Sequence, residues 1–425
     1  MGVTHRTPER VRERLVNRLL ASRRIRSDAV ASAFRAVPRH LFLPGLRIDV
    51  AYADEAVATK WENGVAVSSA SQPSMMAIML EQLDVRPGQR VLEIGAGTGY
   101  NAALLSHLVG PAGSVTAVDI DCDLVEAAAV HLHRAGYDGV ALACQDGALG
   151  YPEAAPYDRI ILTVGSWDIQ PAWLDQLAPG GRLLLPLAVR GSQLSVVFDS
   201  TPGPPQHLRS SSVRGCAFVR LRGAGAGPDT TQPLWDGLLV QTADASPVDA
   251  DALRAVLCKP GPELAIPVPL VSNDLWDGLG LWLAVADPAT CRLLLTDAAA
   301  GSALAPTLVR ARGEGGTLGL IGPEGLAALV RAHRGRGANA VGFRVAVRPF
   351  GSGGRALAEQ VVAHTADWVQ AGSPTADELH LRAYPRDGGP QPDQVGGSTL
   401  IQKEHTTLLL DWPSRPANRD RLDTS

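Results

Sequence analysis

The sequence has few cysteines and no long apolar run, and each of these absences excludes a class of protein. Among its 425 residues are five cysteines, none of them in a CxxC pair. A zinc knuckle or a disulfide framework is therefore not indicated, and we expect buried, reduced thiols in a cytoplasmic protein. The N-terminal residues are charged and lack the apolar core of a signal peptide. The apolar stretch over 183–189 is interrupted by Pro186 and is too short to span a membrane.

An excess of positive charge is also absent. The chain has 39 basic and 43 acidic residues, which give a formal net charge of −4. Without a net positive field, nucleic acid is a poor candidate partner. Apolar residues make up 45% of the chain, so it can bury a core and general disorder is excluded. The length suggests about two or three domains.

Strands and helices alternate between residues 89 and 189, and this rhythm predicts a doubly wound α/β domain. Alternation requires crossover connections, and the uniformly apolar strands indicate a mostly parallel sheet covered on both faces. Two helices are expected over 9–36. An extended stretch over 51–54 and a loop to residue 67 then lead to a helix that begins near Pro73.

Composition divides the remaining chain. The segments QLSVVFDS and CAFVRLRG are expected to form an antiparallel pair that ends a first domain at residues 1–222. The Gly-rich segment 223–233 is typical of a linker. Residues 234–413 are expected to form a strand-rich α+β domain, for which peptide recognition is one candidate role. The KEH triplet over 403–405 is expected at a solvated strand end, and residues 414–425 as a disordered tail.

The strongest local pattern is VLEIGAGTG over 91–99, between a predicted strand and a predicted helix. Gly95, Gly97 and Gly99 give G-x-G-x-G, which differs from the dinucleotide pattern G-x-G-x-x-G. Glycine lets the backbone turn sharply and lets a ligand approach main-chain N–H groups. For the glycines alone, a tight turn without a ligand is the alternative.

Three carboxylates accompany this loop. Asp119 ends the next predicted strand and can accept both hydroxyls of a ribose, while Asp146 ends the third strand and could reach the exocyclic amine of an adenine. Glu93, two residues before the first glycine, suits the ammonium group of a ligand better than a pyrophosphate. The pattern therefore predicts a nucleoside cofactor, with NAD as a competitor.

These motifs resemble those of a known family. E-x-G-x-G-x-G with a downstream acid is similar to class I S-adenosylmethionine-dependent methyltransferases, and residues 8–222 resemble the protein-L-isoaspartate O-methyltransferases. The matching segments are AFRAVPRHLFLP, AYAD, SASQPSMMAIMLEQL, VLEIGAGTGY, AVDID, QDGALG, APYDRIILTVG and QLAPGGRLLLPL. The resemblance implies S-adenosylmethionine as the cofactor and a polypeptide carboxylate, aspartyl or isoaspartyl, as the acceptor. No metal site is expected.

The resemblance also assigns site residues. Those expected to contact the cofactor are Ser71, Glu93, Gly95, Gly97, Thr98, Gly99, Asp119, Ile120, Asp146 and Gly147. In the family, a T-I-S-x-P motif supplies a hydroxyl to the active site; here Ser71 falls at the serine and Ser69 replaces the threonine.

A carboxylate is already ionised at neutral pH, so the acceptor needs a hydroxyl such as that of Ser71 to orient it rather than a base to activate it. Capping of the helix that begins at Pro73 is the alternative role for Ser71. Asp54 and Tyr52 are candidates for a lid over the site.

Two departures from the family bear on the substrate. Repair enzymes carry a loop of the form P-I-G-x-G-Q where this sequence has AVATKWENGVAV over 56–67. The C-terminal segment 396–413 resembles that of actinobacterial homologues associated with ribosomally made, modified peptides (RiPP biosynthesis). That resemblance implies methylation of an Asp in a precursor peptide and cyclisation to a succinimide (aspartimide). General isoaspartyl repair, a tRNA methyltransferase and a non-catalytic peptide-binding relic are the alternatives.

Overall fold

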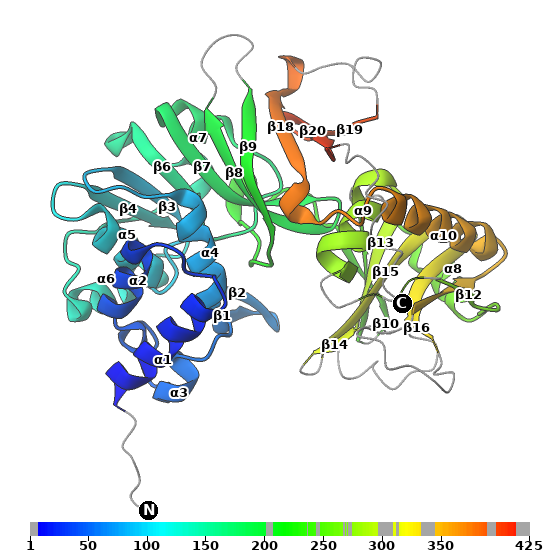
Figure 1. Cartoon of the computed structure of the whole chain (residues 1–425), viewed down its shortest axis with the longest axis horizontal. Coiled ribbons are helices and arrows are strands. Elements are labelled where there is room, and N and C mark those ends of the chain that lie inside the picture. Colours follow the sequence, from blue (N-terminus) through cyan, green and yellow to red (C-terminus); the bar gives the residue numbers. More distant parts are fainter. Residues whose placement is uncertain are drawn as a thin grey trace, which may run out of the picture.

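A ten-stranded sheet forms the centre of the first of two bodies, which lie on the left and right of Figure 1. The computed structural model describes residues 7–200, 207–235, 237–243, 247–266, 268, 270, 274–295, 309–311, 314–332, 345–388 and 397–413. Neighbouring strands at one end of this sheet are parallel, as the alternation of strands and helices predicts. They are β3 (Arg90–Ile94), β4 (Ser114–Asp119), β5 (Ala141–Cys144), β6 (Tyr157–Leu162) and β7 (Leu177–Val189).

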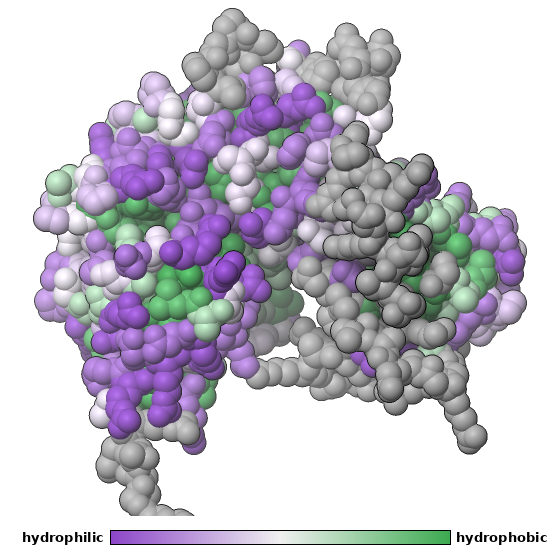
Figure 2. All heavy atoms as spheres, viewed as in Figure 1, coloured by the Kyte–Doolittle hydropathy of each residue, from purple (hydrophilic) through white to green (hydrophobic). Residues whose placement is uncertain are grey.

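Apolar residues cover both faces of these parallel strands. In β3, the neighbours Val91 and Leu92 are fully buried in two different cores, because successive side chains of a strand point to opposite faces. The doubly wound α/β architecture is thereby confirmed. On the face that Figure 2 shows, hydrophilic residues cover most of the first body. Its helices are α1 (Pro8–Ala21), α2 (Asp28–Ala36), α3 (Ile48–Ala51), α4 (Pro73–Leu83), α5 (Tyr100–Val109), α6 (Cys122–Ala135) and α7 (Pro171–Asp175), with 3-10 turns η1 (Arg39–Phe42), η2 (Gly147–Leu149) and η3 (Pro152–Ala154).

The segment before α4 differs from the extended stretch and loop expected there. Ala51 ends α3, and β1 (Val57–Glu62) and β2 (Val65–Ala70) form an antiparallel hairpin. Its turn is Asn63-Gly64, and both residues have positive φ, +50° and +78°. Asn-Gly is the pair that a two-residue hairpin turn favours, so the sequence did contain the signal for this hairpin.

The antiparallel end of the first domain also differs from the prediction. β8 (Ser192–Ser200) pairs with β9 (Leu208–Gly215), so the partner strand begins earlier than the expected segment CAFVRLRG. That segment instead runs past the end of β6. There Gly165 N donates to Val219 O at 2.7 Å, and Leu221 N donates to Gly165 O at 2.8 Å. Because β9 already pairs with β8, residues 216–222 are not needed as its partner strand and can run beside Gly165 instead.

An eight-stranded sheet forms the second body, with the long helix α10 packed on it (Figure 1). Its core is made of Leu, Val and Ala side chains, with Trp368 of α10 also buried. The elements are β10 (Thr231–Trp235), β11 (Leu238–Thr242), α8 (Ala250–Leu257), β12 (Leu264–Ala265), η5 (Asp274–Gly278), α9 (Leu279–Ala286), β13 (Thr290–Leu295), β14 (Val309–Ala311), β15 (Glu314–Gly322), β16 (Gly325–Arg331), β17 (Val345–Phe350) and α10 (Gly354–Gln370).

The chain then returns to the first body, which corrects the expected division at 234–413. β18 pairs with β9, and β20 and β19 extend the ten-stranded sheet beyond it (Figure 1). The physical reason is the sheet edge at β9, whose backbone N–H and C=O groups would be unpaired without β18. The returning strands also bury Leu381, Leu408 and Leu410 in the core of the first body. The elements are η6 (Ala376–Glu378), β18 (His380–Pro385), η7 (Arg386–Gly388), β19 (Thr399–Gln402) and β20 (Thr406–Asp411).

Two further expectations concern the connecting segments. The expected linker 223–233 contains the 3-10 turn η4 (Gly223–Gly225), and β10 begins at Thr231. The KEH triplet is not a solvated strand end. Lys403 is 3% exposed, and its Nζ donates to Ala188 O at 3.2 Å. The expected tail, 414–425, lies outside the described residues.

Candidate active site

A pocket lies at the carboxyl edge of the parallel strands. It is walled by the end of the β1–β2 hairpin, the glycine loop after β3, the ends of β4 and β6, and the segment that leaves the first domain. The lining residues are 67–71, 76, 93–98, 100–101, 118–120, 124, 147, 163–164 and 219–222. Open α/β sheets bind ligands at this edge, so the pocket is where the sequence predicts a cofactor.

The glycine loop requires glycine at both ends. Gly95 and Gly99 have φ of +100° and +85°, a conformation that other residues rarely adopt. A Cβ at Gly95 would lie 2.8 Å from Val164 Cγ1 and 2.9 Å from Thr163 Oγ1. Gly97 and Thr98, also expected at the cofactor, line the pocket between them. Gly99 does not line the pocket; a Cβ there would lie 3.2 Å from Ala128 Cβ of α6. At Gly95 and Gly97, the loop presents its main chain to the pocket.

Glu93 is the most unusual group in the pocket. Its carboxylate is fully buried, and Oε1 accepts a hydrogen bond from Asn101 Nδ2 at 2.9 Å. Burial, aided by the charge of Asp119, raises the pKa of Glu93 to about 8. Within the described part of the chain, Oε2 has no hydrogen-bond partner. A buried carboxylate oxygen without a donor, in the wall of a pocket, fits the ammonium group of a ligand.

The two strand-end acids differ in their accessibility. Asp119 lines the pocket beside Ile120, and its oxygens accept from Gly97 N at 2.9 Å and from Asp121 N at 3.2 Å. Burial raises the pKa of Asp119. Each of its oxygens keeps a lone pair for a ribose hydroxyl.

Asp146 is not among the lining residues, although Gly147 is. Its carboxylate accepts from Ala148 N at 2.9 Å and from Ala224 N at 2.7 Å. These contacts join η2 to the segment that leaves the domain. The adenine contact expected of Asp146 stays a prediction.

The serines lie together beside the glycine loop. Ser68, Ser69 and Ser71 all line the pocket. The N-cap of α4 is Gln72. Ser71 therefore does not cap this helix, which was the alternative to a role at the active site. Arg39, which is 1% exposed, donates to the backbone O of Ser71 at 2.9 Å. Sequence reasoning missed this arginine, whose only signal was its place in the family segment AFRAVPRHLFLP.

Asp54 and Tyr52, the candidates for a lid, both make hydrogen bonds within the first domain. Asp54 Oδ1 accepts from the backbone N of Ser74 at 2.8 Å, so this carboxylate satisfies the N-terminus of α4. Tyr52 is 1% exposed, and its hydroxyl lies 2.9 Å from His40 Nδ1. Neither residue lines the pocket, and the chain passes these positions in a turn after α3 rather than in an extended segment. The roles expected of Asp54 and Tyr52 at the site stay predictions.

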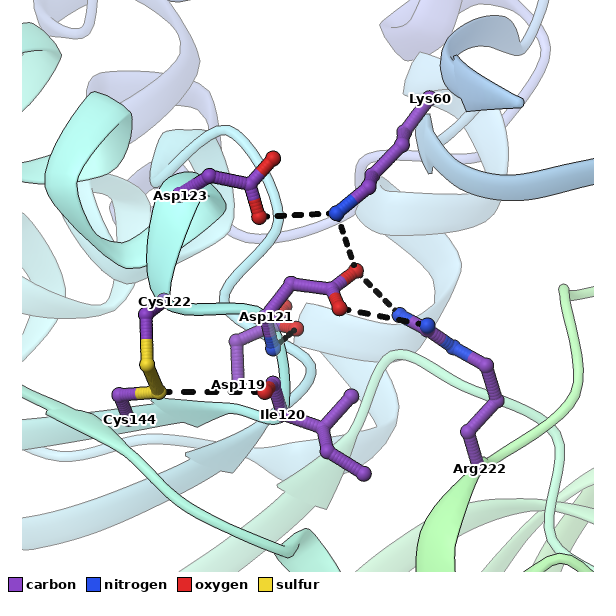
Figure 3. Close-up of a disulfide and its surroundings, with 8 residues drawn as sticks. All are labelled: Lys60, Asp119, Ile120, Asp121, Cys122, Asp123, Cys144 and Arg222. Carbon is purple, nitrogen blue, oxygen red and sulfur yellow. Dashed lines mark hydrogen bonds and ion pairs between the residues drawn. A yellow bond between two sulfur atoms is a disulfide. The ribbon is translucent and has the colours of Figure 1, made fainter. Parts of the chain in front are cut away.

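A cluster of five charges at the rim was also missed. Lys60 Nζ lies 3.1 Å from Asp121 Oδ2 and 2.8 Å from Asp123 Oδ1. Arg222 forms an ion pair with both oxygens of Asp121 and lies 3.4 Å from Glu62 Oε1. Figure 3 shows Asp121 between the two cations. The cluster joins the hairpin, the start of α6 and the segment that leaves the domain, which are remote from one another in the sequence.

Below this cluster, Cys122 and Cys144 form a disulfide (Figure 3). The expectation of buried, reduced thiols is wrong for this pair, and both residues are exposed. The reason is that β4 and β5 are neighbours in the sheet, which brings the start of α6 and the end of β5 together with a Cα–Cα distance of 5.1 Å. The bond ties the two loops that carry Asp119 and Asp146.

Neither a metal cluster nor a membrane-spanning helix is present among the described residues. No group of three or more His, Cys, Asp or Glu side chains there could hold a metal ion. No helix of the same residues is long and apolar enough to cross a membrane.

Comparison with known proteins identifies the first domain. Residues 9–224 match the family described as protein-L-isoaspartate(D-aspartate) O-methyltransferase (PCMT). The chain belongs to this family. A protein-L-isoaspartate O-methyltransferase of Methanopyrus kandleri is 43% identical over 215 residues, which are 50% of this chain and 92% of the relative. One of Hyperthermus butylicus is 41% identical over 221 residues, covering 50% and 88%. A solved protein-L-isoaspartate O-methyltransferase superposes with a TM-score of 0.48 at 24% identity, covering 87% of this chain and 96% of that one.

Membership makes the chain a carboxyl O-methyltransferase that uses S-adenosylmethionine. The residues present fit this cofactor. It carries an ammonium group, for which the unpartnered oxygen of Glu93 is a buried acceptor, and a ribose, for which Asp119 is placed at the strand end. A pyrophosphate in the same place would meet the carboxylate of Glu93, which disfavours NAD.

Proposed function

We propose that this PCMT family member methylates the carboxylate of an aspartyl or isoaspartyl residue in a polypeptide, and that an Asp of a ribosomal precursor peptide is its preferred acceptor. The main support for methyl transfer is that Glu93 and the hydroxyls of Ser69 and Ser71 line the same pocket. The unpartnered oxygen of Glu93 suits the cofactor's ammonium group, and the hydroxyls of Ser69 and Ser71 suit the acceptor's carboxylate.

In this proposal the protein binds, orients and excludes water. Glu93 would hold the cofactor's ammonium group and Asp119 its ribose, and the bound cofactor supplies a methyl group on a positively charged sulfur. The acceptor carboxylate is ionised at neutral pH, so no general base is needed. The hydroxyl of Ser71 donates to one acceptor oxygen and fixes its direction, with Ser69 beside it. The hairpin and residues 219–222 shield this oxygen from water.

The methyl ester then makes cyclisation possible. The backbone nitrogen of the next residue attacks the ester carbonyl, a C–N bond forms, and the C–O bond to the methoxy group breaks. The proton of that nitrogen leaves with the methoxy group as methanol, and a succinimide remains. Its hydrolysis gives aspartate or isoaspartate, which needs only water.

One feature favours a precursor peptide over general repair. The hairpin over 57–70 replaces the P-I-G-x-G-Q loop that repair enzymes resembling this chain carry, and it stands at the pocket. The chain also continues for about 200 residues beyond the family match. This length does not separate the two candidates, since the match to a protein-L-isoaspartate O-methyltransferase of Thermotoga maritima covers only 54% of that relative. General isoaspartyl repair, which the names of the relatives favour, is the second candidate.

A competition experiment tests the proposal. The protein is incubated with S-adenosylmethionine and three peptides: a precursor peptide encoded by a neighbouring gene, its Asp→Asn variant, and an unrelated isoaspartyl peptide. We expect mass spectrometry to show the methyl ester and then the succinimide on the precursor alone. Methylation of only the isoaspartyl peptide would replace this proposal by general repair.

A further inference from the structure

The core of the first body holds the base of the β1–β2 hairpin. Ala70 is 4% exposed there, and Arg39 donates to Ala70 O at 3.3 Å and to Ser71 O at 2.9 Å. Among the described residues, however, β1 and β2 pair only with each other, as a two-stranded sheet. A hairpin without further strands is marginally stable at best. The position of Ser68 and Ser69, which precede this base on β2, therefore depends also on what holds the rest of the hairpin.

The charge cluster defined above supplies two such attachments. Lys60 of β1 binds Asp121 and Asp123 at the start of α6, at 3.1 and 2.8 Å. At the end of the same strand, Glu62 lies 3.4 Å from Arg222. Arg222 in turn binds both oxygens of Asp121. Asp121 is thus the common partner of Lys60 and Arg222, next to the start of α6 (Figure 3).

The two pairs that Asp121 makes are partly buried, unlike ordinary surface ion pairs. The side chains of Asp121, Lys60 and Arg222 are 14%, 24% and 30% exposed, whereas the outer partners Asp123 and Glu62 are 65% and 47% exposed. Burial alone would raise the pKa of Asp121, but the hydrogen bonds from Arg222 and Lys60 outweigh it and lower this pKa. The carboxylate is therefore charged at neutral pH. Partly buried pairs are screened less by salt than exposed ones.

The cluster is also joined to the cofactor pocket. The backbone N of Asp121 donates to Asp119 Oδ1 at 3.2 Å, and Arg222 itself lines the pocket. Asp121 thus contacts Asp119, the carboxylate expected to bind the ribose. On its other side the network binds Lys60 and Glu62 of β1, the strand that pairs with the serine-bearing strand β2. A displacement of the hairpin would move the hydroxyls relative to the cofactor.

From this network we infer that Lys60 and Arg222, acting through Asp121, are positioning residues that hold the hairpin, and with it Ser69 and Ser71, against the bound cofactor. The inference rests on the proposed function for the identity of the acceptor. It adds the residues that set the acceptor's placement, none of which touches the reacting atoms. Lys60 and Glu62 lie in the segment 56–67, where this chain departs from the family loop, whereas Asp121 lies in a segment that the family shares.

Kinetics of the full-length protein test the inference. We expect Lys60→Met to lower kcat/KM for the acceptor peptide about fivefold, with cofactor affinity changed by less than about twofold. Lys60→Arg should restore the wild-type kcat/KM, because it keeps the charge. The matched control is Arg355→Met, which removes an exposed ion pair with Glu359 on α10 and should change neither quantity. An unchanged kcat/KM in Lys60→Met would overturn the inference.

Hydrogen exchange gives a second reading that needs no acceptor. In the double variant Lys60→Met with Glu62→Gln, amides of residues 57–70 should exchange several-fold faster than in the wild type. Amides of α10 should be unchanged, which shows that the fold is intact. If wild-type protein methylates none of the peptides, the proposed function fails, and the exchange of 57–70 alone decides this inference. Wild-type exchange in the double variant would refute it.

Discussion

Asp168 and His405 are 237 positions apart in the sequence, and the backbone N of His405 donates a hydrogen bond to Asp168 Oδ2 at 2.6 Å. Thr406 Oγ1 donates to the other oxygen of the same carboxylate. Next to this contact, Lys403 Nζ lies 3.3 Å from the centroid of the Trp167 ring. The segment before β20 is thereby fixed to the loop after β6, which begins with the pocket residues Thr163 and Val164.

Replacement of Asp168 should therefore destabilise the whole first body. Asp168 is 2% exposed, and Asp168→Ala would leave the donors of Ile169, His405 and Thr406 without this acceptor. Of these three, the donors of Ile169 and Thr406 are buried. Each buried donor left without a partner costs about 1–3 kcal/mol, so we expect the free energy of unfolding to fall by about 2–6 kcal/mol. Urea titration followed by circular dichroism measures it. The control is the exposed Asp175. Equal midpoints for Asp168→Ala and Asp175→Ala would contradict the prediction.

Local patterns in the sequence were sufficient to predict the parallel sheet and the glycine loop. Apolar strands, helix periodicity and the glycines at 95, 97 and 99 are properties of short segments. The return of β18–β20 to the first sheet is different, since it depends on an open edge at β9 that no local pattern reveals. The disulfide between Cys122 and Cys144 arises in the same way, from the adjacency of β4 and β5.

Site residues divide along similar lines. The serine hydroxyls, Glu93 and Asp119 were predicted at the pocket because their residue types follow recognisable motifs. Arg39, Lys60 and Arg222 were missed because each acts through a contact across at least 30 positions. Asp54 lies outside the pocket lining and binds the start of α4, since a carboxylate near a helix start can bind backbone N–H groups as readily as a ligand.

Removal of the Ser71 hydroxyl should affect catalysis and spare cofactor binding. We expect Ser71→Ala to lower the rate of methyl transfer at least about tenfold, because the acceptor loses the donor that orients it. Cofactor affinity should stay within about twofold, since Glu93 and Asp119 are unchanged. Radiolabel transfer and calorimetry measure the two quantities. Full activity of this variant would remove Ser71 from the mechanism.

Loss of the disulfide should lower stability. The bond closes a loop of 22 residues between Cys122 and Cys144. In the chain-entropy account, a loop of this size is worth about 3 kcal/mol, so replacement of both cysteines by serine should lower the free energy of unfolding by about that amount. The exposed free Cys258 supplies the control, Cys258→Ser, which should leave the urea midpoint unchanged. A double variant as stable as this control would show that the bond does not contribute.

Binding of the cofactor should release a proton from Glu93. The pKa of Glu93 in the free protein is about 8, raised by burial from 4.5. At neutral pH most molecules therefore carry a protonated Glu93. An ammonium group beside Oε2 favours the carboxylate, so its arrival lowers this pKa and expels the proton. Affinity should accordingly rise with pH until about 8 and level off above it, because no proton then remains to be released.

Calorimetry in buffers of different ionisation enthalpy measures this release, and Glu93→Gln removes its source. At pH 8 and above, the variant should bind the cofactor about tenfold to a hundredfold more weakly than the wild type, because a neutral amide replaces the charged acceptor. The variant should release no proton, so the difference in affinity should become smaller as the pH falls below about 8. The free wild-type protein should also lose stability as the pH rises from 4.5 through about 8, since its folded state holds the proton more tightly than the unfolded chain. Proton release of equal size in wild type and Glu93→Gln would mean that another group titrates on binding, and Glu93 would then not be the partner of the ammonium group.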